Sequence, residues 1–171
     1  MTEPSRLRQL RPSLLDRLTD RHPHRQLEAA HERVVSEQEL HELVRRDLTW
    51  LFNTTRWSGD ADLARHPHVT KSVLNYGLPA LTGRLLSSVK TEELAEHVLA
   101  ALLRYEPRLV PDSIELAVKV GESAAGTGAL IIEIKAELWA EPLPLDLFVR
   151  TEVDVETGRV SIEDARAEQE G

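Results

Sequence analysis

The chain lacks cysteine, has few aromatic residues and contains no long apolar run. Without cysteine, neither a disulfide nor a thiolate metal site is possible. The net charge of −8 argues against a nucleic-acid partner, because phosphate binding requires a clustered positive surface. No apolar stretch is long enough to span a membrane, and the arginine-containing residues 1–20 have no signal-peptide core. We therefore expect a cytosolic protein without a cofactor.

The N-terminal part, residues 1–35, is expected to contain a docking helix followed by a polar linker. A brief helix is predicted around residues 12–18, with Pro12 in its first turn. Leu14, Leu15 and Leu18 share one face of this helix, and such a face suits docking onto another protein. We predict that these three leucines bind a partner.

Two longer amphipathic helices are predicted next. Ser36 and Glu39 have the spacing of a capping box, and apolar residues then recur at helical spacing until about Asn53. Thr91 is expected to cap the second helix, which ends near Tyr105. Both helices have one apolar face that must be covered by the rest of the domain.

A corner is predicted between these two helices. Gly77 can adopt the left-handed conformation that ends a helix, and Pro79 can start the next one. The sequence therefore favours a helix–turn–helix corner in the geometric sense. A DNA-reading version is not expected, because the segment is apolar and only Lys71 and Arg84 lie nearby.

After residue 107 the hydrophobic period changes from helical to two. Alternating apolar residues predict strands near residues 114–120, 130–138, 145–153 and, more briefly, 160–162. Helices followed by strands predict an α+β fold, with N-terminal helices packed on one face of a C-terminal antiparallel β-meander of three to four strands. The domain would span residues 36–163, with helices in 36–105, strands in 112–163 and a disordered tail at 164–171.

The last predicted strand would lie at the edge of the sheet. It contains Val160 and Ile162, and it follows a hairpin turn at Gly158. An edge strand presents unpaired backbone groups, which are a liability unless they are protected or used for strand addition. We predict that Val160 and Ile162 take part in binding a partner.

The turn Glu106-Pro107-Arg108 carries two opposite charges next to a proline. Proline forces Glu106 out of the helical conformation, and the planar arginine fork suits a carboxylate. Three interpretations are open at this point. Arg108 closes on Glu106, neutralises the negative end of the preceding helix, or binds a partner.

A glycoside hydrolase is an alternative function to consider. Such an enzyme needs two carboxylates across a cleft, one of them with a raised pKa. A cation as close as Arg108 favours the charged form of Glu106, which is the wrong direction for a general acid. The sequence therefore predicts no catalytic residue.

Histidine pairs are the remaining candidate for a chemical site. His22-Pro23-His24 recurs as His66-Pro67-His68, and two such pairs have the residue type that binds metals. Exposed polar loops explain the same pattern, and no acidic residue lies between the paired histidines. We predict no metal site.

Several segments together resemble a known family, the TssE baseplate subunits of type VI secretion systems. That family is similar to the baseplate wedge proteins of contractile-tailed phages. The resemblance covers about residues 12–163. The matching segments are residues 13–18, 47–48, 53–56, 72–79 (Ser-Val-Leu-Asn-Tyr-Gly-Leu-Pro) and 105–109 (Tyr-Glu-Pro-Arg-Leu).

The resemblance implies a structural role and no enzymatic activity. Members are expected in the baseplate on the cytoplasmic side of the inner membrane, beside the subunits TssF and TssG. They also resemble the strand-exchanging domain of sheath subunits, which implies that they seed sheath assembly. The resemblance further implies that Glu106, Pro107 and Arg108 contact other wedge subunits. On this basis Arg108→Ala should leave the isolated fold near intact and weaken wedge assembly.

Three alternatives to this role remain. The family carries an old lysozyme label, so a cell-wall hydrolase is one. A wedge protein of a phage-like contractile particle is the second. The third is a stand-alone adaptor that binds extended peptides by strand addition.

Overall fold

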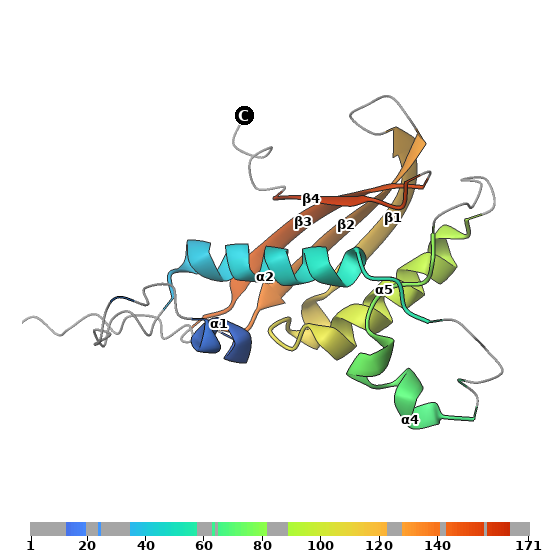
Figure 1. The fold of residues 1–171 in the computed structure, drawn as a ribbon. Helices are drawn as coiled ribbons and strands as arrows, with labels where there is room; N and C mark the ends of the chain where they lie inside the picture. The colour runs from blue at the N-terminus through green and yellow to red at the C-terminus, as the bar shows by residue number, and fades with distance from the viewer. Residues whose placement is uncertain are drawn as a thin grey trace, which may run out of the picture.

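The computed structural model describes residues 13–19, 24, 35–57, 63, 65–81, 89–122, 128–140, 143–155 and 157–164. Helices come first and a four-stranded antiparallel sheet follows, which confirms the predicted α+β class (Figure 1). The described elements are α1 (Leu14–Leu18), α2 (Glu37–Phe52), α4 (Pro67–Thr70), η2 (Val73–Asn75), α5 (Thr91–Tyr105), η4 (Pro111–Ser113), β1 (Glu115–Glu122), β2 (Gly128–Leu138), β3 (Leu145–Asp154) and β4 (Val160–Asp164).

The sheet is a simple meander in which each strand pairs with the next along the chain. Its order is β1-β2-β3-β4, so β4 is an edge strand, as predicted. Helices α2 and α5 lie across one face of the sheet (Figure 1). Ile132 of β2, Leu48 of α2 and Leu102 of α5 are fully buried in this interface. Burial of one such side chain contributes about 1.5–3 kcal/mol, so the core between helices and sheet holds the fold together.

Helix α2 begins and ends where the sequence predicts. The Ser36 hydroxyl accepts a hydrogen bond from the Glu39 backbone N–H at 3.1 Å, and Asn53 is the C-cap. The prediction that Thr91 caps α5 is wrong by one residue. Lys90 is the N-cap, with extended backbone angles and no side-chain capping bond, so Thr91 is already the first helical residue.

The predicted helix–turn–helix corner is also wrong. Gly77 does adopt a positive φ of 117°, but no helix begins at Pro79 within the described residues up to 81. The Leu78 N–H instead donates to the Thr54 carbonyl at 2.9 Å, and the Leu78 carbonyl accepts from the Arg56 N–H at 2.8 Å. Residues 79–81 are irregular, and the chain before them is fixed by the pairing of Leu78 with the segment after α2.

Some predicted segments lie outside the described residues. These are Pro12, nearly all of the linker at residues 20–34, and the tail at residues 165–171. The division of the chain into a docking segment, a domain and a tail therefore stays a prediction. Among the helices that are described, none is both long enough and apolar enough to cross a membrane.

Candidate functional site

The Arg108 side chain closes on Glu106, which is one of the three interpretations left open by the sequence. Its Nε donates to Glu106 Oε1 at 2.6 Å and its Nη2 donates to Glu106 Oε2 at 2.5 Å. Nη2 also donates to Asp47 Oδ2 at 2.6 Å. The guanidinium therefore makes the two-pronged contact with one carboxylate that suits its planar shape, and bridges to a second carboxylate on α2.

The local backbone explains why Glu106 faces inward. Glu106 is the C-cap of α5, and its N–H still donates to the Leu102 carbonyl at 2.9 Å. Pro107 then prevents the helix from continuing. The Arg108 N–H turns back to Glu106 Oε1 at 3.1 Å. As a result Glu106 is buried, with 4% of its surface exposed, while Pro107 stands on the surface.

Five charged side chains form a continuous line from this turn to α1, which we call the charge ladder: Asp16, Arg46, Asp47, Arg108 and Glu106. Asp47 Oδ1 accepts hydrogen bonds from Arg46 Nε at 2.9 Å and Nη2 at 2.6 Å. Arg46 Nη1 donates to Asp16 Oδ1 at 2.7 Å. Charges alternate in sign along the ladder, so each carboxylate contacts at least one guanidinium and each guanidinium two carboxylates.

The environment favours the charged forms of two members of the charge ladder, Asp16 and Arg108. Burial by itself raises the pKa of Asp16, but hydrogen bonds from Ser13 and Arg46 and the charge of Arg46 outweigh it, so the pKa lies below its usual value. Burial by itself lowers the pKa of Arg108, but the bonds and charges of Glu106 and Asp47 raise it above its usual value. Asp16 and Arg108 are therefore both charged at neutral pH.

A tyrosine pair joins the two segments that the sequence singled out, residues 72–79 and 105–109. The rings of Tyr76 and Tyr105 meet edge to face, with centroids 5.0 Å apart. The Tyr105 hydroxyl donates to the Ser72 carbonyl at 3.0 Å and lies 3.1 Å from the Asn75 carbonyl. The Tyr76 hydroxyl donates to the Asp47 carbonyl at 3.4 Å. Burial, followed by the charges of Asp47 and Glu106, raises the pKa of Tyr76.

The part of the chain that contains both segments and the turn matches a known family in sequence. The family model of baseplate wedge protein gp25 matches residues 38–143, which is more than half of the chain. The chain belongs to the gp25 family. This is also the family of TssE-like baseplate proteins of type VI secretion systems, which confirms the resemblance found in the sequence. Searches of curated proteins and of solved structures gave no match.

Membership of the gp25 family supports a structural role in the baseplate of a contractile machine. The matched residues include α2, the Tyr76 segment and the Glu106-Pro107-Arg108 turn. They do not include α1 or β4. The family match therefore says nothing about the two outer elements that the sequence assigned to partner binding.

Helix α1 is oriented in the opposite way to an ordinary surface helix. Its polar residue Asp16 is directed inward, with 4% of its side chain exposed, and holds Arg46. Its leucines Leu14, Leu15 and Leu18 are exposed, at 71%, 50% and 74%. The predicted apolar face is thus present and faces away from the described part of the protein.

The predicted residues of the edge strand contribute to the core. Val160 is buried, and Ile162 is half-buried and packs against the core cluster. Their side chains point to the helix side of the sheet, because they pair with the core-facing positions Val153 and Thr151. What β4 can offer to a partner is therefore mainly its outer backbone edge.

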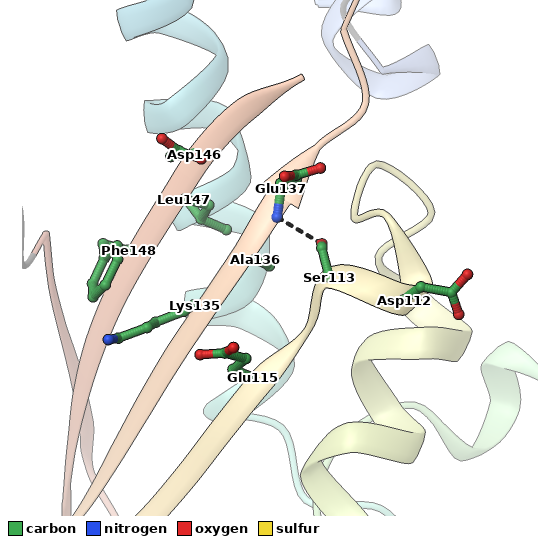
Figure 2. Close-up of a pocket in the computed structure, with 9 residues that line it drawn as sticks. All are labelled: Asp112, Ser113, Glu115, Lys135, Ala136, Glu137, Asp146, Leu147 and Phe148. Atoms are coloured by element: carbon green, nitrogen blue, oxygen red, sulfur yellow. Dashed lines mark hydrogen bonds between the residues drawn. The ribbon is translucent and has the colours of Figure 1, made fainter. Parts of the chain in front are cut away.

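An open hollow lies on the other face of the sheet, with α2 behind it in the view of Figure 2. Carboxylates of Asp112, Glu115, Glu137 and Asp146 surround it, and Lys135 Nζ lies 4.7 Å from the centroid of the Phe148 ring. Glu106 does not line this hollow, and both of its oxygens accept hydrogen bonds from Arg108. The structure therefore places Glu106 in an ion pair away from this hollow.

The described part of the chain contains no group of three or more side chains that could hold a metal. His66 is the N-cap of α4, and Pro67 and His68 lie within that helix. His22 and Pro23 lie outside the described residues.

Sequence reasoning missed the two residues that connect the turn to the rest of the protein, Arg46 and Asp47. From the sequence, neither residue was assigned a role in this site. The only available signal was the occurrence of Asp47 within one of the resembling segments. Nothing in helical periodicity indicates that these side chains bridge α1 to the turn after α5.

Proposed function

We propose that this protein is the baseplate wedge subunit of a type VI secretion system, without enzymatic activity. It binds TssF and TssG, and it seeds sheath assembly through strand contacts on the cytoplasmic side of the inner membrane. The gp25 family match supports the baseplate role. The pairing of Glu106 carries the proposal, because a carboxylate with both oxygens bound to Arg108 supports a fixed surface and offers no reactive group.

The turn is suited to binding because it is rigid before any partner arrives. Glu106 and Arg108 are held from two directions, by the turn itself and by Asp47 on α2. Rigid surfaces lose less conformational entropy on association. Pro107 is exposed, and 18% of the Arg108 side chain is exposed, although its Nη1 atom is buried. We infer that wedge subunits contact Pro107 and the exposed part of Arg108.

Helix α1 supplies a second contact in this proposal. Leu14, Leu15 and Leu18 form its exposed apolar face, while the Asp16–Arg46 pair holds the helix to the domain. Exposed leucines grouped on one helix suit burial against another subunit. We propose that α1 docks onto TssF or TssG.

A co-purification experiment tests the wedge contacts. Arg108→Ala is compared with Arg104→Ala, because Arg104 lies at the same helix end, is exposed and lies outside the charge ladder. Binding to a TssF–TssG complex is measured at a temperature at which both variants are folded. The proposal expects at least tenfold weaker binding for Arg108→Ala only. Equal binding of folded Arg108→Ala and wild type would remove Arg108 from the interface.

Two further observations separate this function from the alternatives. Peptidoglycan turnover that is lost in Glu106→Gln would establish a hydrolase and contradict the proposal. Neighbouring genes for sheath and for the other baseplate subunits of a secretion system would support it. Neighbouring genes for phage structural proteins would instead indicate a phage-like contractile particle.

A further inference from the structure

The register of β3 and β4 shows which backbone groups of β4 face outward. The Asp154 N–H donates to the Arg159 carbonyl at 3.0 Å, and Val153 lies opposite Val160. In an antiparallel ladder this makes Val153 and Val160 a non-hydrogen-bonded pair. The N–H and carbonyl of Val160 therefore point away from β3. The same holds for Ile162, two residues further along.

The side chain of Asn53 occupies the outward groups of Val160. Its Oδ1 accepts from the Val160 N–H at 3.2 Å, and its Nδ2 donates to the Val160 carbonyl at 3.2 Å. Nδ2 also donates to the Thr49 carbonyl at 2.9 Å, which fixes the carboxamide at the end of α2. If the carboxamide were flipped, Nδ2 would face the Val160 N–H and Oδ1 would face the two carbonyls. None of the three hydrogen bonds could then form, so the orientation of Asn53 is fixed. A carboxamide bonded in this way reproduces the pair of bonds that a neighbouring strand residue would make.

Beyond Val160 the edge is open in the part of the chain that is described. No hydrogen bond reaches the outward N–H or carbonyl of Ile162 from any described residue. We propose that Asn53 is a register stop. An added strand cannot pair with Val160 and must begin its hydrogen bonds at Ile162. This inference rests on the strand addition of the proposed function and specifies where it takes place.

The residues around the open edge also specify the chemistry of the added segment. A residue opposite Ile162 would place its side chain on the helix side of the sheet, beside the half-buried Ile162, and is therefore apolar. A residue opposite Glu163 would lie on the other face, beside an exposed carboxylate. Opposite charges stabilise such cross-strand pairs, so this residue is basic. The occupant is an extended protein segment that alternates apolar and basic residues.

Removing the stop should move the register by two residues. Asn53→Ala frees the outward N–H and carbonyl of Val160, so an added strand can begin its hydrogen bonds there. The shift is two residues and not one, because a shift of one residue would exchange the two faces of the added strand. Thr54→Ala is the matched control. Its hydroxyl donates to the Trp50 carbonyl at 2.7 Å at the same helix end, and within the described residues it makes no hydrogen bond to β4.

Cross-linking measures this register directly, because the chain has no cysteine of its own. Ser161→Cys places a single thiol on exposed β4. The probes are alternating valine–lysine peptides of about six residues, a typical strand length, each with one cysteine at a different position. We expect the best disulfide partner to shift by two positions in Asn53→Ala and to stay unchanged in Thr54→Ala.

Amide hydrogen exchange provides a measurement without a partner. Exchange of the Val160 amide should be about five- to tenfold faster in Asn53→Ala than in wild type. This factor corresponds to the net free energy of one hydrogen bond. Equal exchange, or cross-linking whose register does not move, would overturn the register stop alone. Absence of any cross-link, with the peptides or with a purified sheath subunit, would overturn strand addition at β4 and the register stop with it.

Discussion

Arg108→Ala is expected to lower the free energy of unfolding by about 3 kcal/mol, because it leaves the buried carboxylate of Glu106 without its counterion. Removing one partner of a buried ion pair costs roughly 3–5 kcal/mol. The lower end applies here because 18% of the Arg108 side chain is exposed, while Asp47 keeps its contact with Arg46. From the sequence alone the variant is expected to be near intact, whereas the buried ion pair predicts this loss.

Thermal and urea unfolding of the isolated protein measure the effect. A loss of about 3 kcal/mol corresponds to a fall in Tm of roughly 6–12 °C for a protein of this size. Arg104→Ala should stay within about 1 kcal/mol of wild type, because it removes only an exposed bond to the Thr70 carbonyl and a weak ring contact.

A double variant tests whether the unpaired charge is the cause. Glu106→Gln combined with Arg108→Ala removes both charges and should recover about 1 kcal/mol or more of the loss. The reasoning is wrong if Arg108→Ala unfolds within about 0.5 kcal/mol of wild type, the range typical of surface substitutions. It is equally wrong if the double variant is no more stable than Arg108→Ala.

Three other outcomes follow from the structure. Gly77→Ala should lower the free energy of unfolding in urea by at least about 1–3 kcal/mol. The reason is that residue 77 has a φ of 117° and a Cβ there would lie 2.2 Å from the Thr54 carbonyl oxygen. An unchanged free energy of unfolding would contradict this close approach. Since Asp16 has a lowered pKa when folded, its contribution holds above the unfolded value of 3.8 and is lost as pH falls below it. Amide protection factors in α1, relative to the intrinsic exchange rate, should fall over that range, and Asp16→Asn should remove this pH dependence; unchanged protection at acid pH refutes this anchor. Leu18→Ser should leave Tm unchanged within about 2 °C, since the side chain is 74% exposed, yet weaken capture by TssF–TssG; normal capture excludes α1 as a docking helix.

Local patterns in the sequence were sufficient for the elements and their order. A capping serine and helical spacing located α2, and the change to a period of two located all four strands. The edge position of β4 also followed, because short turns between consecutive strands produce a meander. These features depend on residues close together in the chain, where spacing and turn chemistry decide the structure.

The wrong predictions at Thr91 and Pro79 share a cause. Each relied on the usual place of a residue type at a helix end. At Pro79, backbone groups of Leu78 pair instead with the segment after α2, which is distant in sequence. Local propensity is weaker than such a pairing, because leaving buried backbone groups without partners costs more than a favourable cap contributes.

The sequence by itself determined the helices, the strands, the stiff charged turn and the family resemblance. Only the tertiary structure decided that Arg108 bridges Glu106 to Asp47, 61 residues away, and that Asn53 covers Val160, 107 residues away. Periodicity states which face of an element is buried, but the partner of a polar side chain depends on how two elements cross. That crossing is set by the packing of the whole core, so no short segment of the chain contains it.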